Sequence, residues 1–288
     1  MPNAKDYQGE FRNYLVYGMS GAGKSSAFLS YPGPKFAYVF DPSGLETFAG
    51  HDVEYEMFVP DIVTTKHGTL GKGSSSAKII RPDPLTYEKF EADFEQRVGD
   101  GYFFKRGGII GFESATTLLE LLVWYILDKQ GRGNSVPEIQ DYWFRADGFA
   151  KLMRVALAQR CEVFCSAHIE TAQDETTKVI ETGLAFPQAL KNRIPLLFSE
   201  IIPLKAEVNE KDGAVNYFAH FAPTKRIQQV RTSLKGMKPL VDITMDWKKH
   251  LEGQGFFGLY KGKYAKFKSP EELAEINKIR MDGSVPQE

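Results

Sequence analysis

The sequence predicts an α/β protein with a mostly parallel sheet flanked by helices. Segments with strand character alternate with segments of helical periodicity along most of the 288-residue chain, and this alternation is typical of parallel sheets covered on both faces. One apolar strand runs directly into a glycine-rich loop, and a second apolar stretch, GGIIGFES, leads straight into a strongly apolar helix. In such sheets, ligands bind at the carboxyl ends of the strands.

The first hundred residues carry strand and helix patterns separated by turn residues. In order, they predict a strand at 11–18, a short helix that ends before Pro32, a strand at 35–42, a possible strand at 54–60, a Gly-, Ser- and Lys-rich loop at 66–77, a short strand at 78–81 and a helix near 86–97.

The rest of the chain continues the alternation and then changes character. It predicts a strand at 107–114, a helix at 115–129, a break at 131–138, a helix at 141–160, a strand at 161–168, a long polar loop at 169–192 and two late strands at 196–208 and 214–223, joined around the turn NEKDG. We therefore divide the chain into a core, residues 1–247, and a small basic and aromatic C-terminal appendage, residues 248–288.

Composition excludes several classes of protein. Apolar residues make up 42% and charged residues 25%, with a formal net charge of −1, unlike disordered or disulfide-stapled chains. No apolar run approaches the ~20 residues that a membrane span requires, so no membrane association is expected. The start lacks the apolar core of a secretory signal. Cys161 and Cys165 lie in an apolar strand, and we expect both to be reduced core residues of a cytoplasmic protein.

The segment from Gly18 to Ser25, GMSGAGKS, matches the pattern G-x-x-x-x-G-K-[ST] in full. A predicted strand precedes it and a predicted helix follows, as the phosphate-binding loop requires. The alternative is a glycine-rich turn that matches the pattern by chance. Successive backbone N–H groups of such a loop point at phosphate oxygens, the lysine reaches the β and γ phosphates, and the serine hydroxyl ligates Mg²⁺. The loop thus predicts the phosphates of a nucleotide and Mg²⁺ as ligands, and the candidate nucleotide-binding residues are Gly18, Ser20, Gly21, Ala22, Gly23, Lys24, Ser25 and Ser26.

A phosphate-loop NTPase needs an acid at the end of another strand to complete the Mg²⁺ shell. Glu113 ends the predicted strand at 107–114, so Ser25 and Glu113 are the candidate metal residues. Most such proteins carry aspartate at this place, and the longer glutamate pushes its carboxylate outward by about one methylene, which matters because Mg²⁺ demands near-octahedral geometry. Glu113 is therefore a metal-shell residue, a base for the attacking water, or an acid that caps the next helix.

Two further acids lie near the same predicted edge. Asp41 ends the strand at 35–42, and Glu46 follows five residues later. Either is a candidate for orienting the attacking water, and for each a role in a turn or helix cap is an equally good interpretation.

Together these pieces resemble the minimal RecA-like ATPases of phages, a group linked to single-strand annealing and recombination. The likeness covers residues 11–235 and rests on the strand, phosphate loop and helix, on KFAYVFD, on IIGFES before an apolar helix, on Ser166-Ala167-His168 ending a strand, and on Thr224-Lys225-Arg226 after the late strands. The resemblance implies a RecA-like core, ATP and Mg²⁺, a homo-oligomeric ring or filament, single-stranded DNA as partner, and the host cytoplasm as location if the protein is phage-encoded.

The resemblance also implies roles for single residues. It places His168 at the position that senses the γ-phosphate, an assignment compatible with an imidazole at a strand's carboxyl end; the alternative is a histidine satisfied by neighbouring backbone. It suggests that the loop after His168 faces DNA. Two departures stand out: Glu113 replaces the usual aspartate, and Ser43 lies near where the wider group carries a catalytic glutamate. Hydrolysis is therefore expected to be slow or differently arranged.

Charge is distributed unevenly. Residues 221–269 contain eleven Lys or Arg and three Asp or Glu, while the remainder carries 25 basic and 34 acidic residues, a distribution that favours polyanion binding. Within this stretch, FFGLYKGKYAKFK interleaves aromatic residues with lysines. Aromatic rings can stack on bases while lysines contact phosphates; the alternative is a solvated basic face whose aromatics form a small core.

Another interpretation splits the basic stretch. In a RecA-like assembly, Lys225, Arg226 or Arg231 could reach a neighbouring subunit's γ-phosphate. We assign this catalytic role to Lys225 or Arg226. The candidate catalytic residues are therefore Lys24, Asp41, Glu113, His168 and Arg226. The loops at 129–137 and 169–192 are expected on the ligand side of the sheet.

We thus expect a RecA-like ATPase that acts on single-stranded DNA in phage recombination, annealing or replication. Two alternatives remain: a nucleotide-dependent scaffold with little hydrolysis, consistent with Glu113 and Ser43, and a small-molecule phosphotransferase, for which no lid with clustered arginines is evident.

Overall fold

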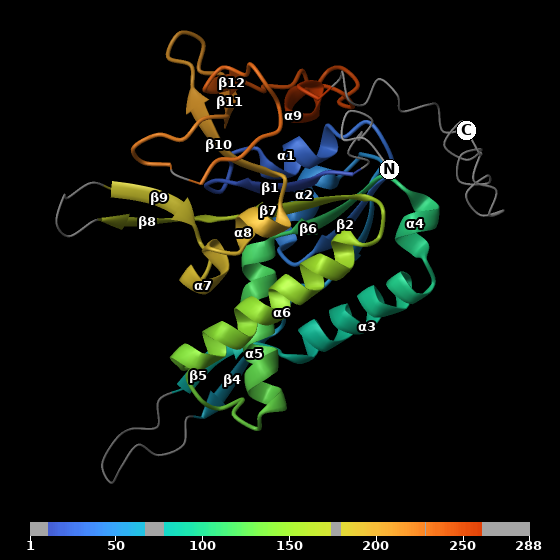
Figure 1. The fold of residues 1–288 in the computed structure, drawn as a ribbon, viewed down its shortest axis with the longest axis vertical. Coiled ribbons are helices and arrows are strands. Elements are labelled where there is room, and N and C mark those ends of the chain that lie inside the picture. Colours follow the sequence, from blue (N-terminus) through green and yellow to red (C-terminus); the bar gives the residue numbers. More distant parts are fainter. Residues whose placement is uncertain (1–10, 67–77, 174–179, 228, 261–288) are drawn as a thin grey trace, which may run out of the picture.

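An eight-stranded sheet forms the centre of the computed structural model, which describes residues 11–66, 78–173, 180–227 and 229–260 (Figure 1). Six neighbouring strands are parallel, and the last two are antiparallel additions at one edge. From that edge, the strand order is β12 (Leu240–Asp242), β11 (Val215–His220), β10 (Glu200–Val208), β1 (Asn13–Tyr17), β7 (Glu162–Ala167), β6 (Ile109–Glu113), β2 (Lys35–Val39) and β3 (Glu54–Met57).

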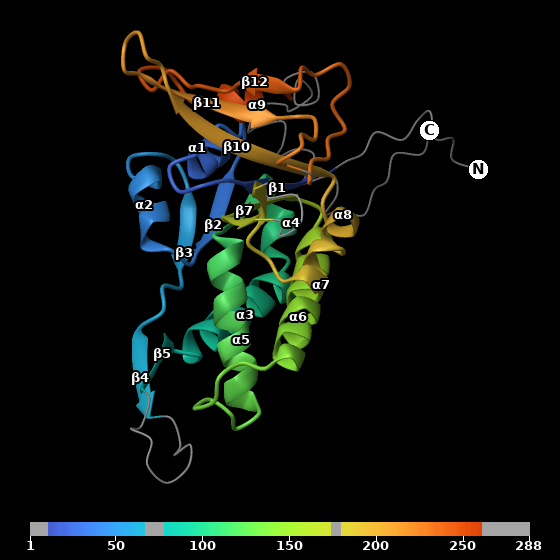
Figure 2. The same cartoon turned by 90° about the vertical axis from the view of Figure 1, so that its left-hand side faces the viewer.

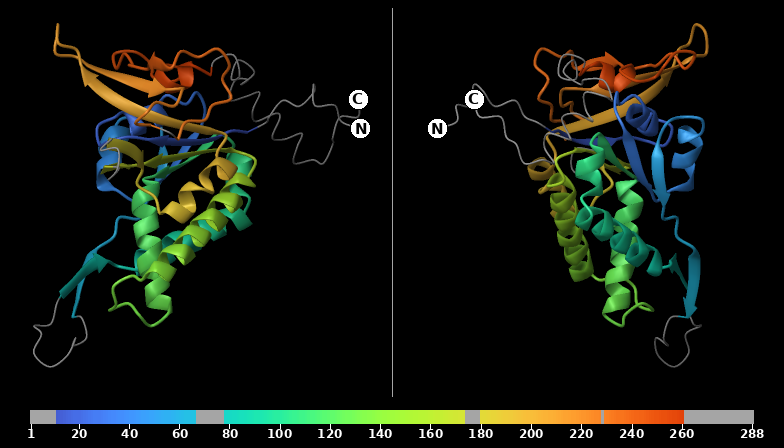
Figure 3. Two further views of the ribbon diagram at one scale, coloured as in Figure 1. Left: turned by 60° about the vertical axis from the view of Figure 1, so that its left-hand side comes forward. Right: turned by 90° about the vertical axis from the view of Figure 1, so that its right-hand side faces the viewer.

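Helices cover both faces of this sheet, because alternate side chains of each strand enter two different cores. Leu15 and Tyr17 of β1 pack toward one core, and Tyr14 and Val16 pack toward the other. Figures 2 and 3 show the two helical layers. The first core lies under α3 (Leu85–Gly99), α4 (Tyr102–Arg106), α5 (Ala115–Lys129), α6 (Ile139–Leu157), α7 (Gln188–Lys191) and α8 (Ile194–Leu197), and the second under α1 (Lys24–Leu29), α2 (Pro42–Phe48) and α9 (Gly255–Gly258).

The predicted fold class, a mostly parallel sheet flanked by helices, is therefore confirmed. Cys161 and Cys165 are buried free thiols, as expected. Among the helices of the described ranges, none combines the length and apolar character needed to cross a membrane.

Two short antiparallel hairpins project from the body of the molecule (Figure 1). One pairs β4 (Ile62–Lys66) with β5 (Lys78–Pro82), and the other pairs β8 (Ile169–Gln173) with β9 (Ile180–Leu184). The predicted loop at 66–77 falls almost entirely outside the described residues, and the strand expected at 78–81 corresponds to β5.

The expectation of a long loop at 169–192 is wrong. This segment forms β8, β9 and α7, because backbone pairing between IETAQ and IETGL builds a two-stranded ribbon without needing a continuous apolar stripe. The sequence patterns also missed α2, α4, β4 and β12, all short elements.

The described part of the predicted C-terminal appendage packs against the second core. Phe256, Phe257 and Tyr260 are buried, and each ring makes an edge contact with Tyr14 of β1. The hydroxyl of Ser30 accepts a hydrogen bond from the Phe257 amide. The aromatics described here therefore belong to a core, which was the alternative to base stacking. The boundary at residue 247 stays a prediction, and residues 261–288 lie outside the described ranges.

Candidate functional site

A cavity of about 210 Å³ opens where β1, β2, β6 and β7 end. This is the sheet edge at which ligands of parallel α/β proteins bind. The phosphate loop forms one wall, and β11 contributes a side chain from the antiparallel edge of the sheet. The lining residues are Ser20, Gly21, Gly23, Lys24, Ser25, Ser26, Asp41, Ser43, Thr47, Glu113, His168 and Tyr217.

The phosphate loop has the backbone that its glycines predict. Gly21 and Gly23 have φ values of 75° and 85°, in the left-handed region, where glycine carries no Cβ penalty. Gly18 donates its amide to Ala167 O at 3.1 Å, and a Cβ on Gly18 would lie 2.6 Å from Leu204 O. Neither Gly18 nor Ala22 lines the cavity. Gly18 holds the start of the loop between β7 and β10, and Ala22 is buried beside it.

Lys24 begins α1 and is almost fully buried. Its ammonium donates to Gly18 O at 3.1 Å and to Met19 O at 2.8 Å, so it is folded back across the loop. Burial lowers the pKa of Lys24, while the Glu113 and Asp41 carboxylates act in the opposite direction. A phosphate at this place would supply the charge that a buried ammonium requires.

Ser25 and Glu113 meet as the metal assignment requires. The Ser25 hydroxyl donates to Glu113 Oε1 at 3.0 Å, although 88 positions separate the two residues. Burial raises the pKa of the Glu113 carboxyl, and the hydroxyls of Ser166 and Ser25 and the Lys24 ammonium oppose that shift. A cation would relieve the burial of this carboxylate.

The residues present fit a Mg²⁺ ion that is shared with the nucleotide. Across the described ranges, no group of three or more His, Cys, Asp or Glu side chains could hold a metal alone. One hydroxyl and one carboxylate leave most of an octahedral shell to water and phosphate oxygens, as is usual for Mg²⁺ at phosphate sites.

Asp41 both caps α2 and lines the cavity. Its Oδ1 caps α2 by accepting from the Ser43 amide at 3.1 Å and from the Ser43 hydroxyl at 2.8 Å, which confirms the capping interpretation. It also lines the cavity, as does Ser43, whereas Glu46 is exposed and does not. Of the two acids proposed to orient water, only Asp41 lines the cavity, and the role itself stays a prediction.

His168 follows β7 and lines the cavity. Its amide donates to Thr116 Oγ1 at 2.9 Å and its carbonyl accepts from the Ala185 amide, so backbone contacts fix the residue at the cavity wall. Burial, and secondarily the Lys24 ammonium, lowers the pKa of His168. The lowered pKa favours the neutral ring, which can donate one hydrogen bond to phosphate.

Arg226 lies outside the cavity of its own chain. The residue is exposed, and its carbonyl accepts from the Thr182 amide of β9. Lys225 is likewise exposed, and Arg231 pairs through its backbone with Ile201 of β10. None of the three lines the site. Their assignment to a neighbouring subunit's phosphate stays a prediction.

Sequence reasoning missed Thr47 and Tyr217. A Cβ on Gly23 would lie 2.7 Å from Tyr217 Cδ1, so the tyrosine ring rests directly on the phosphate loop. Strand alternation in VNYFAH places Tyr217 on the face of the buried Ala219. No local pattern indicates that this face meets a loop almost 200 positions away.

Comparisons with known proteins give distant likenesses only. No family model matches the sequence, and no curated protein matches it. Among solved structures, the flagellar accessory protein FlaH from Methanocaldococcus jannaschii is similar at 11% identity and a TM-score of 0.36, covering 82% of this chain and 85% of its own. A KaiC-like protein from Pyrococcus horikoshii OT3 is similar at 10% identity and a TM-score of 0.39, covering 80% and 88%.

Proposed function

We propose that this chain is a RecA-like ATPase that binds ATP with Mg²⁺ and hydrolyses it. One observation carries the proposal: Lys24, Ser25 and Glu113 converge on one cavity beside a loop with the complete phosphate-binding pattern. Bound Mg²⁺ would neutralise charge on the phosphates. Lys24 would hold the β and γ phosphates, His168 would donate to the γ-phosphate, and Asp41 or Glu113 would orient the attacking water.

We propose that the base of the nucleotide binds beside Tyr217 and Trp247. Tyr217 and Trp247 border the same narrow gap beside Gly23 and Ser26. Trp247 is 49% exposed. Aromatic and apolar side chains next to a phosphate site suit a purine.

Single-stranded DNA is the proposed partner, with a homo-oligomeric ring or filament as the acting form in phage recombination, annealing or replication. Support comes from a surface segment, described over residues 225–227 and 229–249, that carries seven Lys or Arg and two Asp or Glu. All seven basic residues are exposed. Because phosphate contacts dominate such binding, affinity should fall steeply with salt.

The decisive experiment measures ATP affinity, ATP turnover and assembly mass with and without single-stranded DNA. Lys24→Met should weaken ATP binding by at least tenfold, since charge-assisted hydrogen bonds contribute about 1.5–3 kcal/mol. The matched control is Lys89→Met, which changes an exposed lysine on α3. Undiminished affinity in Lys24→Met would refute the site.

A nucleotide-dependent scaffold is the second candidate, favoured by Ser43 in the cavity wall and by the burial of Glu113. Tight ATP binding with negligible turnover, including after Glu113→Asp, would support the scaffold over the ATPase.

A further inference from the structure

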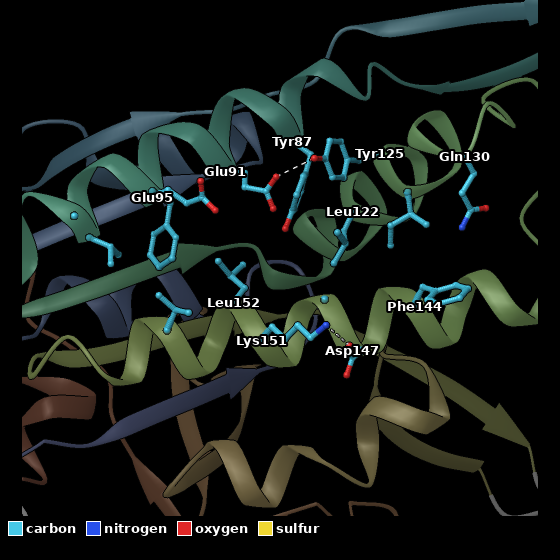
Figure 4. A pocket seen from close by; sticks show the side chains of 16 residues that line it. Tyr87, Glu91, Glu95, Leu122, Tyr125, Gln130, Phe144, Asp147, Lys151 and Leu152 are labelled. Carbon is cyan, nitrogen blue, oxygen red and sulfur yellow. Dashed lines mark hydrogen bonds and ion pairs between the residues drawn. The ribbon is translucent and has the colours of Figure 1, made fainter.

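A second cavity, of about 580 Å³, lies in a groove between α3, α5 and α6 (Figure 4). This volume is within the ~300–1,000 Å³ range of ligand pockets. Apolar side chains dominate the lining, among them Phe94, Leu122 and Leu152. The groove shares no lining residue with the nucleotide cavity, so it is a separate candidate site.

The groove is long, with two helices as its walls. Figure 4 shows α3 on one side and α6 on the other, both running the same way. The lining extends from Tyr87 to Gly99 on α3 and from Phe144 to Val155 on α6, which at 1.5 Å per residue is about 16–18 Å, or three helical turns. At the two ends of the α6 wall, Phe144 and Val155 are 45% and 42% exposed. An apolar slot of this length suits an amphipathic helix with anchors at i, i+3 or i+4, and i+7.

One end of the groove adjoins further exposed apolar side chains. The Trp143 ring meets the Phe144 ring edge-on, with 5.5 Å between centroids. Ile139, one turn before Trp143 on α6, is exposed as well. Exposed apolar surface of this kind is typical of protein–protein contacts, so a protein segment fits this surface better than a free small molecule does.

The α3 wall is negatively charged. Glu91 and Glu95 both line it, and within the described part of the chain neither forms an ion pair. Glu91 accepts the Tyr125 hydroxyl at 3.0 Å. Burial raises the pKa of Tyr125 to about 12, and the hydrogen bond and charge of Glu91 act in the same direction. On the α6 wall, Lys151 is paired with Asp147 at 2.8 Å. A positively charged flank facing α3 would therefore complement the groove.

We propose that the α3–α5–α6 groove binds a basic amphipathic helix of a partner protein. The apolar face of that helix contacts Leu122 and Leu152, and its basic flank lies beside Glu91 and Glu95. The inference is independent of the ATPase proposal, because the two cavities have no residue in common.

Synthetic peptides added to the full chain test this docking. The probe is a helical peptide of about four turns, with leucines at i, i+3, i+4 and i+7 and lysines on the flanks. One control peptide replaces every lysine with glutamate, and the other is the lysine peptide in scrambled order. An environment-sensitive dye on Val155→Cys reports occupancy of the groove, and the same dye on Val208→Cys, exposed at the end of β10, is the reference. The native thiols are buried.

We expect the lysine peptide to give a saturable signal at position 155 and none at position 208. Its affinity should exceed that of both control peptides at least tenfold. Because Glu95 is exposed and Glu91 partly so, the preference for lysine over glutamate should shrink as salt is added.

Charge reversal provides the second arm. Glu91→Lys with Glu95→Lys should invert the preference, so that the glutamate peptide binds at least tenfold more tightly than the lysine peptide. The matched control, Glu207→Lys with Glu210→Lys, reverses two exposed acids at and just beyond the end of β10 and should leave the preference within threefold of wild type.

Four outcomes would overturn the proposal. The first is the absence of a saturable signal from the lysine peptide, and the second is equal binding of the scrambled peptide. The third is a signal from decyltrimethylammonium without one from the lysine peptide, which would assign the groove to a small cationic amphiphile. The fourth is loss of peptide binding as protein concentration and assembly mass rise together, which would assign the groove to a neighbouring copy of this chain.

Discussion

Replacing Gly23 with alanine probes the contact between the phosphate loop and β11. Gly23 has a φ of 85°, and a residue with a Cβ in this region costs about 1–2 kcal/mol. The new Cβ would also lie 2.7 Å from Tyr217 Cδ1, so the ring must move, and such overpacking costs about 1–3 kcal/mol. We therefore expect Gly23→Ala to lower the free energy of unfolding by roughly 2–5 kcal/mol.

The chain provides a matched control for this change. Gly21 has a φ of 75°, and a Cβ there would have no neighbour within 4 Å, so Gly21→Ala should cost only the backbone part, about 1–2 kcal/mol.

Denaturant unfolding of the wild type, both alanine variants and their combinations with Tyr217→Ala gives the coupling energies. Removing the Tyr217 ring should cut the cost of Gly23→Ala to that of Gly21→Ala. A coupling below about 0.5 kcal/mol would refute the close contact.

Four further outcomes are expected at the nucleotide site. Glu113→Asp should raise Mg²⁺-dependent turnover, because a shorter side chain opens the 3.0 Å contact with Ser25 to an ion; a fall would identify Glu113 as the base. Burial raises the pKa of Glu113. The fraction of ionised Glu113 should therefore increase as the pH rises through that pKa, and Mg²⁺-dependent ATP affinity should increase with it. Titration calorimetry of Glu113→Gln should show this part of the pH dependence removed, and an unchanged profile would contradict the assignment. His168→Gln should slow turnover by tenfold or more, in the range typical of a lost transition-state donor, with ATP affinity within threefold of wild type; a parallel loss of affinity would make the residue structural. Arg226→Ala should reduce turnover only in the assembled protein, as judged by turnover against oligomer mass, and an equal effect in the monomer would exclude a role across subunits.

The elements that the sequence predicts well are those specified by local pattern. Local sequence is enough to predict three features. The apolar run around Ile109 and Ile110 predicts β6, and the glycine-rich phosphate loop predicts its own backbone and the start of α1. The meeting of Ser25 and Glu113 was also predictable, since parallel strands bring their carboxyl ends to one edge.

Features that depend on distant partners were not predictable in the same way. In the sequence, Tyr217 is one residue of an alternating strand pattern. Its place over Gly23 follows from the pairing of β10 with both β1 and β11. From the sequence, Phe256 and Phe257 resemble exposed aromatic residues beside lysines. In the structure the Phe257 ring packs against Tyr14, and its amide donates to the Ser30 hydroxyl. The hairpin of β8 and β9 is stabilised by backbone pairing, which leaves little trace in a hydrophobicity pattern.

The position of β1 in the sheet has a consequence for synthesis of the chain. Asn13 pairs with Val163 and Tyr14 with Glu200, so β1 lacks β7 until 150 further positions have been translated, and it lacks β10 for longer still. At ribosomal rates of about 5–20 residues per second, the 150 positions between Asn13 and Val163 take roughly 8–30 s to translate. During that interval an apolar strand with two open edges emerges from the ribosome unpaired, the kind of segment that chaperones shield and that aggregates when they are scarce. Expression at lowered temperature or with added chaperones should therefore change the soluble yield of this protein more than its stability once folded.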